Sequence, residues 1–346
     1  MEPIPIAIIN WNGLADTKEC ISSVLASKGI DYTIHLLDNA SDNNEYDELS
    51  QLYKDTPVTV HYSDVNLGFT GGSNLLFDII LKESKSEYIV LLNNDTIVDE
   101  LWLSELVKHA KSKKSHIVSS KMISYYNRDA MDNAGHMMLN TGEIIPIGHA
   151  RSKTEHNDPT TNMGACAGAA LYNRNMLEEI GVFDPVFSTG YEDAELGLRA
   201  KVFGYNCTYC PSAIVYHKMG SSIRKIFNED YSTMIQTSIL YSYFKLLPKA
   251  NIIKALPSFV FKTFAMIIID VLFFRPKYLR VLFKSWSNVF KMRHKITAER
   301  KRLKSLKKIS SSKISSELVF FLWFDMVRFW NIIILRKSSS IDSYSN

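Results

Sequence analysis

The stretch Tyr88–Thr96, YIVLLNNDT, decides the fold class of this chain. Its apolar run, Ile89–Leu92, stops at a polar and acidic tip that contains Asp95. The pattern predicts a buried parallel strand that carries a carboxylate to the carboxyl end of a sheet, where open α/β sheets bind ligands. A carboxylate at that edge suits a hard divalent cation shared with substrate phosphates. Taken alone, the string is equally compatible with a strand followed by an Asx turn.

The composition of the 346 residues is that of a globular protein, with 46% apolar and 22% charged residues. Four cysteines are too few for a disulfide scaffold at this length. The CxxC pair Cys207 and Cys210 has no second pair with which to bind zinc. The first residues lack the basic and apolar regions of a signal peptide, so we expect a cytosolic protein.

Charge is unevenly distributed along the chain. Residues 1–220 hold 17 Lys and Arg against 29 Asp and Glu, whereas residues 221–346 hold 23 against 7. An acidic front part and a strongly basic tail predict two regions with different roles.

Strand-like and helix-like segments alternate along the first 120 residues. Apolar strands are expected at 4–10, 33–38, 58–62, 88–92 and 117–120, with helices at 16–27, 46–53, 73–82 and 101–111 between them. This alternation predicts an α/β fold with a mostly parallel sheet and right-handed crossovers. Polar side chains follow several of the strands: Asn10, Asn12, Asp38, Asn39, Asn94 and Asp95. We expect them to gather along one edge of the sheet.

A glycine-rich stretch, Val65–Asn74, precedes the third predicted helix. Gly68, Gly71 and Gly72 allow unusual backbone angles and close approach to a ligand. A glycine-rich turn that leads into a helix N-terminus can hold phosphate. The stretch matches neither GxGxxG nor a Walker loop, and a tight turn with a helix cap is the alternative.

The later segments are less regular. Residues 121–164 are polar and predict a short hairpin and a mobile loop, whereas Ala165–Asn173 predicts a strand of small residues in which Gly168 leaves room for a ligand. Gly190–Phe203 predicts a helix with an acidic start, and Cys207–His217 predicts a late strand.

Eight motifs occur in order across residues 4–222: IAIINWNG, LLDNASDN, VNLGFTGGSN, LLNNDT, GACAGAALYNR, GVFDPVF, GYEDAELGLRA and AIVYHKMGSS. The ordered set resembles family 2 glycosyltransferases with the GT-A fold, in particular their rhamnosyltransferase-like branch. The resemblance implies transfer of a sugar from a nucleotide diphosphate donor to an acceptor hydroxyl, with inversion at the anomeric carbon.

The resemblance also implies roles for individual residues. The donor would be bound by Asn10, Asn12, Asp38, Asn39, Gly68, Gly71, Asn74 and Asn94. Asp95 would bind Mn²⁺ or Mg²⁺ with His217 as a second ligand, although a strand-ending histidine can also be an ordinary surface residue. The family often carries another acid two positions before Asp95, where this chain has Asn93.

Asp193 is the candidate general base that the resemblance implies, with Glu192 as the alternative. The acceptor would contact Gly168, Tyr191, Glu195 and Arg199, although Tyr191 could be a packing residue, and Glu195 and Arg199 could instead fix the helix. A purely structural interpretation also exists for the acidic residues, because carboxylates in the first turn of a helix are stabilised by the helix dipole.

The tail, residues 226–346, lacks these motifs. Its apolar segments, 252–274 and 318–335, are interrupted by charges and are not expected to span a membrane. With the basic run 291–313 they fit a location on an anionic membrane surface. The alternatives are helices that cover the catalytic domain or form a homodimer, and a nucleic-acid site, for which no base-reading motif is present.

These features together predict an inverting, metal-dependent glycosyltransferase. Residues 1–225 would form the GT-A catalytic domain, with a nucleotide-sugar half (1–120) and an acceptor half (121–225), and 226–346 a helical extension. The donor would be dTDP-rhamnose, or else a UDP-hexose or UDP-galactofuranose, and the acceptor a lipid-linked or growing cell-surface polysaccharide. The enzyme would lie in the cytoplasm, peripherally associated with the inner face of the cell membrane.

Two other functions remain open. A sugar-1-phosphate nucleotidyltransferase would need a basic glycine-rich loop after the first strand, and NWNGLA there has no Lys or Arg. A non-catalytic sugar- or nucleotide-binding scaffold would keep the fold without the acidic residues.

Overall fold

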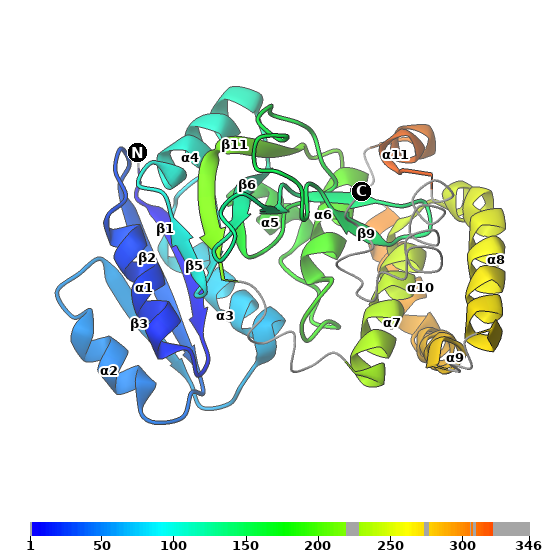
Figure 1. Ribbon diagram of the computed structural model, residues 1–346, viewed down its shortest axis with the longest axis horizontal. Coiled ribbons are helices and arrows are strands. Elements are labelled where there is room, and N and C mark those ends of the chain that lie inside the picture. Colours follow the sequence, from blue (N-terminus) through cyan, green and yellow to red (C-terminus); the bar gives the residue numbers. More distant parts are fainter. Residues whose placement is uncertain (1, 219–227, 273–276, 305, 307–308, 321–346) are drawn as a thin grey trace. The chain divides into compact units, whose positions relative to one another are not determined.

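A computed structural model describes residues 2–218, 228–272, 277–304, 306 and 309–320 (Figure 1). The chain divides into two compact units. The first comprises 1–136, 146–200 and 205–219, and the second comprises 137–145, 201–204 and 220–346. The predicted domain boundary at residue 225 stays a prediction.

The first unit is built on a nine-stranded sheet with the order β3-β2-β1-β4-β10-β6-β11-β5, with β7 beside β6. Its first half consists of parallel strands: β1 (Ile4–Asn10), β2 (Tyr32–Asn39), β3 (Val58–Ser63) and β4 (Tyr88–Asn93). All four run in the same direction, so their polar carboxyl ends meet at one edge. The predicted α/β fold class is confirmed.

The second half of the sheet is mixed. β10 (Ala169–Asn173) runs antiparallel between β4 and β6 (Ile117–Ser124). β11 (Cys207–His217) is parallel to β6 and antiparallel to the short β5 (Thr96–Val98). The last residue of β11 therefore pairs with Thr96, one residue after Asp95.

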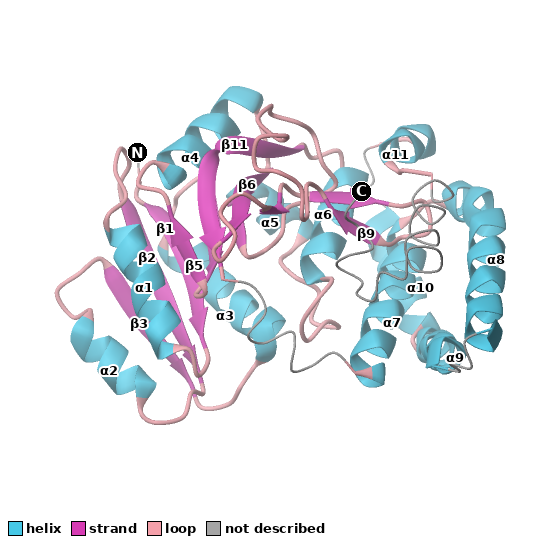
Figure 2. Cartoon of the chain, in the orientation of Figure 1, coloured by secondary structure: helices cyan, strands magenta, loops and turns pink. Residues whose placement is uncertain are grey.

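Helices cover both faces of this sheet (Figure 2). α1 (Leu14–Leu25) and α4 (Trp102–Lys113) share a core with Ile4, Ile6 and Ile8 of β1. α3 (Gly68–Glu83) lies against the opposite face, where a Cβ on Gly72 would come within 3.2 Å of Ile9 and Leu37. The alternation of side chains along β1 explains why one strand contributes to both layers.

The remaining helices of the first unit are α2 (Glu45–Leu52), α5 (Arg174–Ile180) and α6 (Glu192–Val202), of which α6 continues beyond the first unit at residue 201. One prediction is wrong in its boundary: the helix expected from residue 73 begins at Gly68. The glycine-rich stretch is thus the first turn of α3 rather than a separate loop, because only its first glycine has a positive φ, of 68°.

The region 121–164 contains the expected hairpin and more. β7 (Met131–Asn133) adds to β6, and β8 (His136–Met138) with β9 (Ile144–Pro146) forms a separate two-stranded sheet. These short strands hold polar side chains that the sequence pattern alone did not place.

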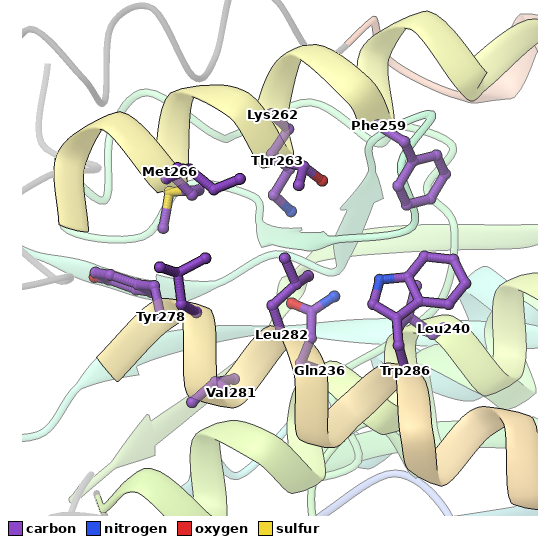
Figure 3. A pocket seen from close by; sticks show the side chains of 12 residues that line it. Gln236, Leu240, Phe259, Lys262, Thr263, Met266, Tyr278, Val281, Leu282 and Trp286 are labelled. Carbon is purple, nitrogen blue, oxygen red and sulfur yellow. The ribbon is translucent and has the colours of Figure 1, made fainter. Parts of the chain in front are cut away.

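Apart from residues 137–145, which hold most of the β8–β9 sheet, and the end of α6, the described part of the second unit is helical. Its helices are α7 (Glu229–Leu246), α8 (Lys249–Leu272), α9 (Lys277–Lys291), α10 (Arg293–Lys304) and α11 (Ser311–Glu317). An open pocket lies between α7, α8 and α9, and the side chains that line it include Phe259, Met266, Leu282 and Trp286 (Figure 3). Ser285 of α9 donates to the Thr233 carbonyl oxygen of α7 at 3.2 Å, which ties these two helices together.

The expectation that no tail segment spans a membrane stays a prediction. Among the described residues, Lys249–Leu272 is long and apolar enough to cross a membrane, judged by length and composition, with a mean hydropathy of 1.9 over its best window. The charges that interrupt this segment are too few to exclude a span. The other apolar segment lies outside the described residues from 321 onward.

Candidate active site

Asp95 and His217 come together because β5 pairs with β11. The two strands place Thr96 opposite His217, and the Lys218 amide donates to the Asp95 carbonyl oxygen at 2.9 Å. His217 Nε2 consequently lies 3.3 Å from Asp95 Oδ1. Both side chains are largely buried yet not sealed, so a small ligand can reach them.

A second carboxylate, Asp132 of β7, lies on the other side of the His217 ring. Its Oδ2 is 2.7 Å from His217 Nδ1, and its Oδ1 is 3.6 Å from His149 Nδ1. The Asp132 carbonyl oxygen also lies 3.1 Å from His149 Nδ1. Two imidazoles and two carboxylates therefore alternate at this end of the sheet.

Hydrogen bonding and burial act in opposite directions on these groups. Burial alone would lower the pKa of His217, but hydrogen bonds to Asp132 and Asp95 outweigh it and raise that pKa to about 10. Burial would likewise raise the pKa of Asp132, but His149 and His217 lower it to about 2. Without a bound cation, His217 is thus a charged imidazolium between two carboxylates.

Asn93, which stands where the family often has an acid, faces a different loop. Its backbone N–H donates to the Gly168 carbonyl oxygen at 2.9 Å. A Cβ on Gly168 would lie 3.2 Å from Asn93 Nδ2 and 3.1 Å from Met122 Cε. Gly168 therefore permits close packing of this loop on β4, and no acceptor contact follows from that packing.

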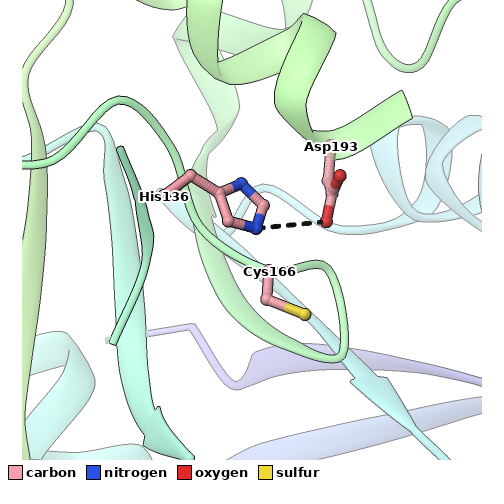
Figure 4. Close-up of side chains that lie close together, drawn as sticks. All are labelled: His136, Cys166 and Asp193. Atoms are coloured by element: carbon pink, nitrogen blue, oxygen red, sulfur yellow. Dashed lines mark ion pairs between the residues drawn. The ribbon is translucent and has the colours of Figure 1, made fainter. Parts of the chain in front are cut away.

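Asp193 lies at the start of α6 beside His136 and Cys166 (Figure 4). Its Oδ2 accepts a hydrogen bond from the Ala167 amide at 3.0 Å and lies 4.0 Å from His136 Nε2. Burial lowers the pKa of His136, and the nearby Asp193 only partly offsets this, so the imidazole stays neutral. Burial, followed by the charges of Asp193 and Asp132, raises the pKa of the Cys166 thiol well above its usual value.

Glu192, the alternative base, is buried and close to Asp193. Burial and the charge of Asp193 raise the pKa of Glu192 to about 8. A carboxyl group that keeps its proton at neutral pH is a poor proton acceptor. The arrangement therefore favours Asp193 over Glu192 as the base.

Glu195 and Arg199 do not fit the predicted acceptor-binding role. Their ion pair, 2.7 Å long, is almost fully buried, and Arg199 also donates to the carbonyl oxygens of Ile180, Gly181 and Val182. These bonds hold α6 against the 180–182 loop. Breaking one partner of such a buried pair costs about 3–5 kcal/mol of stability.

Tyr191 precedes α6 in an unusual backbone conformation. Its φ is 78°, which is rare for a residue other than glycine and is strained for an aromatic side chain. The ring is largely buried, with a centroid 6.4 Å from that of Phe187. Tyr191 therefore places the two acids of α6 and offers little surface to an acceptor.

The predicted donor residues form a connected network at the ends of β1 and β2. Asn10 Nδ2 lies 2.9 Å from Asp38 Oδ1 and 2.8 Å from Glu45 Oε2, while Asn10 Oδ1 accepts from Thr17. Asn94 Nδ2 in turn donates to Thr17 Oγ1 at 2.9 Å, so the network reaches the tip of β4.

Asn12 and Asn39 hold the loops that follow these two strands. The Asn12 and Asp42 groups bond in both directions, at 2.7 and 3.0 Å. Asn39 Oδ1 accepts from the Leu67 amide at 2.9 Å, which fixes the entry to α3. The expected clustering of polar groups is present, although most of these side chains bond to one another.

Gly68, Gly71 and Asn74 contact other parts of the chain. A Cβ on Gly68 would lie 3.0 Å from the Ser188 carbonyl oxygen, and one on Gly71 would clash with Leu67 Cβ at 2.9 Å. Asn74 exchanges two hydrogen bonds with the Phe183 backbone, at 3.0 and 3.1 Å. Gly68 and Asn74 thus lie against the 183–188 loop, and the bonds of Asn74 to the Phe183 backbone leave it no direct contact with a donor.

Two groups of side chains in the described part of the chain offer metal-ligand atoms. Asp95 and His217 present a carboxylate and an imidazole at the sheet edge, a donor pair that suits Mn²⁺ or Mg²⁺. The ligand atoms of His136, Cys166 and Asp193 lie within 4.8 Å of one another. That set suits a catalytic cation less well, because the thiol holds its proton.

The sequence did not single out Asp132, His136, His149 or Cys166. Asp132, His136 and His149 come from a segment with no clear hydrophobic period, and the partners of the four residues lie 17 to 85 residues away. The only available signal was the density of polar and histidine residues in MDNAGHMM, Met131–Met138.

Comparison with known proteins agrees with this architecture. The model of Glycosyl transferase family 2 matches residues 6–181. O-antigen biosynthesis protein RfbC of Myxococcus xanthus is 28% identical over 150 residues, which are 40% of this chain and 12% of that protein. Low-salt glycan biosynthesis hexosyltransferase Agl10 of Haloferax volcanii is 24% identical over 224 residues, 63% of this chain and 67% of that protein.

A solved structure shares the fold. The crystal structure of GalNAc-T7 with UDP, GalNAc and Mn²⁺ aligns with a TM-score of 0.53 and 15% identity, over 70% of this chain and 50% of that one. The fold is thus of the GT-A type. The match to RfbC spans about an eighth of that protein's length, so its activity as a whole does not transfer to this chain.

Proposed function

Because this chain belongs to glycosyl transferase family 2, we propose that it transfers a sugar, with inversion, from a nucleotide diphosphate donor to a hydroxyl group of a glycan. The observation that carries the proposal is the pairing of β5 with β11. It places His217 Nε2 3.3 Å from Asp95 Oδ1, at the edge where the Asn10 and Asp38 network also ends. The side chains proposed to bind the cation and those proposed to bind the nucleotide thus lie at the same edge of the sheet.

A divalent cation would be held by Asp95 and His217 and would offset the negative charge that develops on the leaving diphosphate. Mixed imidazole and carboxylate ligation favours Mn²⁺ somewhat over Mg²⁺. The amide at Asn93 supplies no charge, so the affinity depends strongly on the two remaining ligands.

Asp193 is the proposed base that removes the proton of the acceptor hydroxyl. The hydrogen bond from the Ala167 amide holds one of its oxygens, and its side chain is partly open to solvent. Glu192 beside it keeps its proton and adds no second negative charge.

The nucleotide would bind where Asp38 and Asn39 end β2, with dTDP-rhamnose proposed as the donor and UDP-linked sugars as the alternative. A thermal-shift panel of nucleotide sugars with Mn²⁺ tests this. Stabilisation by dTDP- or UDP-sugars, and none by purine nucleotide sugars, is expected. If no pyrimidine nucleotide sugar stabilises the protein, the donor proposal fails.

We further propose that the helical unit binds the inner face of the cell membrane, where a lipid-linked polysaccharide precursor would be the acceptor. Most of the large exposed apolar side chains in the described residues lie on α8 and α9: Ile253, Leu256, Val260, Phe261, Phe264, Ile268, Val271, Leu272, Tyr278, Phe283, Trp286 and Phe290. Basic residues Arg280 and Lys284 of α9 are about half exposed. Exposed apolar and basic residues on the same helices suit an anionic bilayer.

Liposome flotation tests this part of the proposal. Replacement of two exposed residues, Val260→Glu with Phe264→Glu, should abolish binding to anionic liposomes. Leu52→Glu, at a similarly exposed apolar residue of α2, is the matched control and should leave binding intact. A wild-type protein that does not float, and is a dimer in solution, would instead favour an interface between two copies.

Release of nucleoside diphosphate separates the proposed activity from the other two functions. A glycosyltransferase releases it only when cation, donor and acceptor are all present. A nucleotidyltransferase would release pyrophosphate from a nucleoside triphosphate, and a binding scaffold would release nothing.

A further inference from the structure

Asp132 has no role in the proposed transfer as described so far, yet its carboxylate lies between two histidines of the site. It lies on β7, and its side chain is 9% exposed. Its Oδ2 is 2.7 Å from His217 Nδ1 and its Oδ1 is 3.6 Å from His149 Nδ1. Burial of a charged carboxylate destabilises the folded state unless its oxygens are paired. The contacts of Asp132 with the two histidines offset this free-energy cost.

The contact determines which nitrogen of His217 carries a proton. A carboxylate accepts and cannot donate, so the proton of this hydrogen bond must sit on Nδ1. Nε2, on the opposite side of the ring, faces Asp95 Oδ1 at 3.3 Å. In the neutral imidazole the lone pair is therefore on Nε2, pointing to the side of Asp95.

The same contact fixes the orientation of the ring. His217 is the last residue of β11 and pairs with Thr96 of β5 and Ser124 of β6, which fixes its backbone and leaves the rotation of its side chain to be set by hydrogen bonds. Asp132 is held by the pairing of β7 with β6, and the Ile123↔Met131 register places its strand beside β6. Asp132 thus connects the end of β11 to β7, which pairs with β6.

We propose that Asp132 is a positioning residue that keeps His217 in the Nδ1–H tautomer, with Nε2 directed at a divalent cation shared with Asp95. The inference rests on the proposed function, since that cation belongs to the sugar-transfer site. Carboxylates that accept the second N–H of a metal-binding histidine typically contribute a factor of 10–100 to metal affinity.

The test compares Asp132→Asn with a matched control, Asp129→Asn. Asp129 lies three residues earlier, and its side chain is 90% exposed. The one side-chain interaction described for its carboxylate is the ion pair with Lys153, so Asp129→Asn removes the same charge outside the site. Titration with Mn²⁺ followed by electron paramagnetic resonance gives the affinities directly. We expect Asp132→Asn to weaken Mn²⁺ binding about 10–100-fold, and Asp129→Asn to change it less than about threefold.

A second measurement uses the unaltered protein, in case Asp132→Asn does not fold. Nitrogen-15 NMR of the imidazoles, with Zn²⁺ as a diamagnetic substitute, reports which nitrogen of His217 bears the proton. A proton on Nδ1 with the metal resonance shift on Nε2 is expected. A proton that stays on Nε2 when Zn²⁺ is bound, or a folded Asp132→Asn protein with wild-type Mn²⁺ affinity, overturns the proposal.

Sugar transfer by the wild-type protein separates this inference from the proposed function. A wild-type protein that transfers sugar while Asp132→Asn binds Mn²⁺ normally overturns the positioning role alone. A wild-type protein that transfers sugar but binds no divalent cation overturns the metal site and the positioning role, and one that neither binds a cation nor transfers sugar overturns both proposals.

Discussion

The site contains two Asp–His pairs with the same residue types and opposite behaviour. His217 bonds to Asp132 at 2.7 Å and lies 3.3 Å from Asp95, and its pKa rises to about 10. His136 is 4.0 Å from Asp193, is more completely buried, and its pKa falls. For His217, hydrogen bonds to two carboxylates raise the pKa more than burial lowers it. For His136, the single carboxylate at 4.0 Å raises the pKa less than burial lowers it.

This difference assigns different chemistry to the two pairs. The first concentrates ligand atoms and negative charge, which suits a cation. The second leaves an aspartate beside a neutral imidazole and a protonated Glu192, which suits proton transfer. Variants in each pair should therefore separate metal binding from catalysis.

The largest effect is expected from Asp95→Asn. Loss of the charged ligand should weaken Mn²⁺ binding at least 100-fold and lower kcat/KM for sugar transfer about 10³-fold, because the leaving diphosphate loses its counter-charge. Nucleoside diphosphate release measured over a range of Mn²⁺ concentrations checks this. Normal transfer at low Mn²⁺ would remove Asp95 from the metal site.

Asp193→Asn should lower kcat about 10²–10³-fold while leaving Mn²⁺ affinity unchanged. The amide keeps the size of the side chain and removes its ability to accept a proton. Single-turnover transfer and Mn²⁺ titration on the same preparation make the comparison. Transfer at nearly the wild-type rate would rule out Asp193 as the base.

Glu192→Gln tests the assignment of Asp193 rather than Glu192 as the base, because only a small change in kcat is expected. Glutamine resembles the protonated carboxyl group that a pKa of about 8 implies, so kcat at pH 7 should change less than about threefold. A loss as large as that of Asp193→Asn would mean that Glu192 is the ionised group. The rates of both variants should be measured side by side.

The smallest expected effect is on the pH dependence of protein stability and comes from His35, a buried histidine outside the site. His35 and His61 stack with ring centroids 5.4 Å apart, and burial, with a contribution from His61, lowers the pKa of His35 to about 4. Since the unfolded state binds a proton below pH 6.5 and the folded state does not, stability should fall by about 1–2 kcal/mol between pH 7 and pH 5.

Urea denaturation at both pH values measures this change. His35→Gln should reduce the difference between the two, and the exposed His294→Gln is the control. Equal stability of the wild-type protein at pH 7 and pH 5 would contradict the expectation.

The parallel half of the fold was readable from local pattern. Apolar runs such as Ile89–Leu92 are long enough, and regularly enough separated by amphipathic helices, to specify strands without knowledge of their neighbours. Strand ends carrying Asp38 and Asp95 followed from the same alternation. The strand that contains β10 was also predicted, but its antiparallel direction was not. The three-residue strands β7, β8 and β9 could not be placed, because so short a strand has no period.

Burial also changed the assignments for several residues. Glu195 and Arg199 were expected either to fix the helix or to touch the substrate, and their side chains are enclosed and bonded to each other. Asn74 was placed near a donor and instead bonds to the Phe183 backbone. A sequence shows that a polar side chain is present, whereas only the folded structure shows whether that side chain is hydrogen-bonded or ion-paired within the protein.

The sequence by itself determined the α/β alternation, the edge of the sheet at which polar groups collect, and the identities of Asp95, Asp193 and His217 as candidates. Only the tertiary structure determined that His217 lies between Asp95 and Asp132, that Glu192 is buried, and that the apolar faces of α8 and α9 are exposed. The physical reason is that hydrophobic period and chain order are local properties. Hydrogen-bond partners, burial and pKa depend on residues brought together from distant parts of the chain.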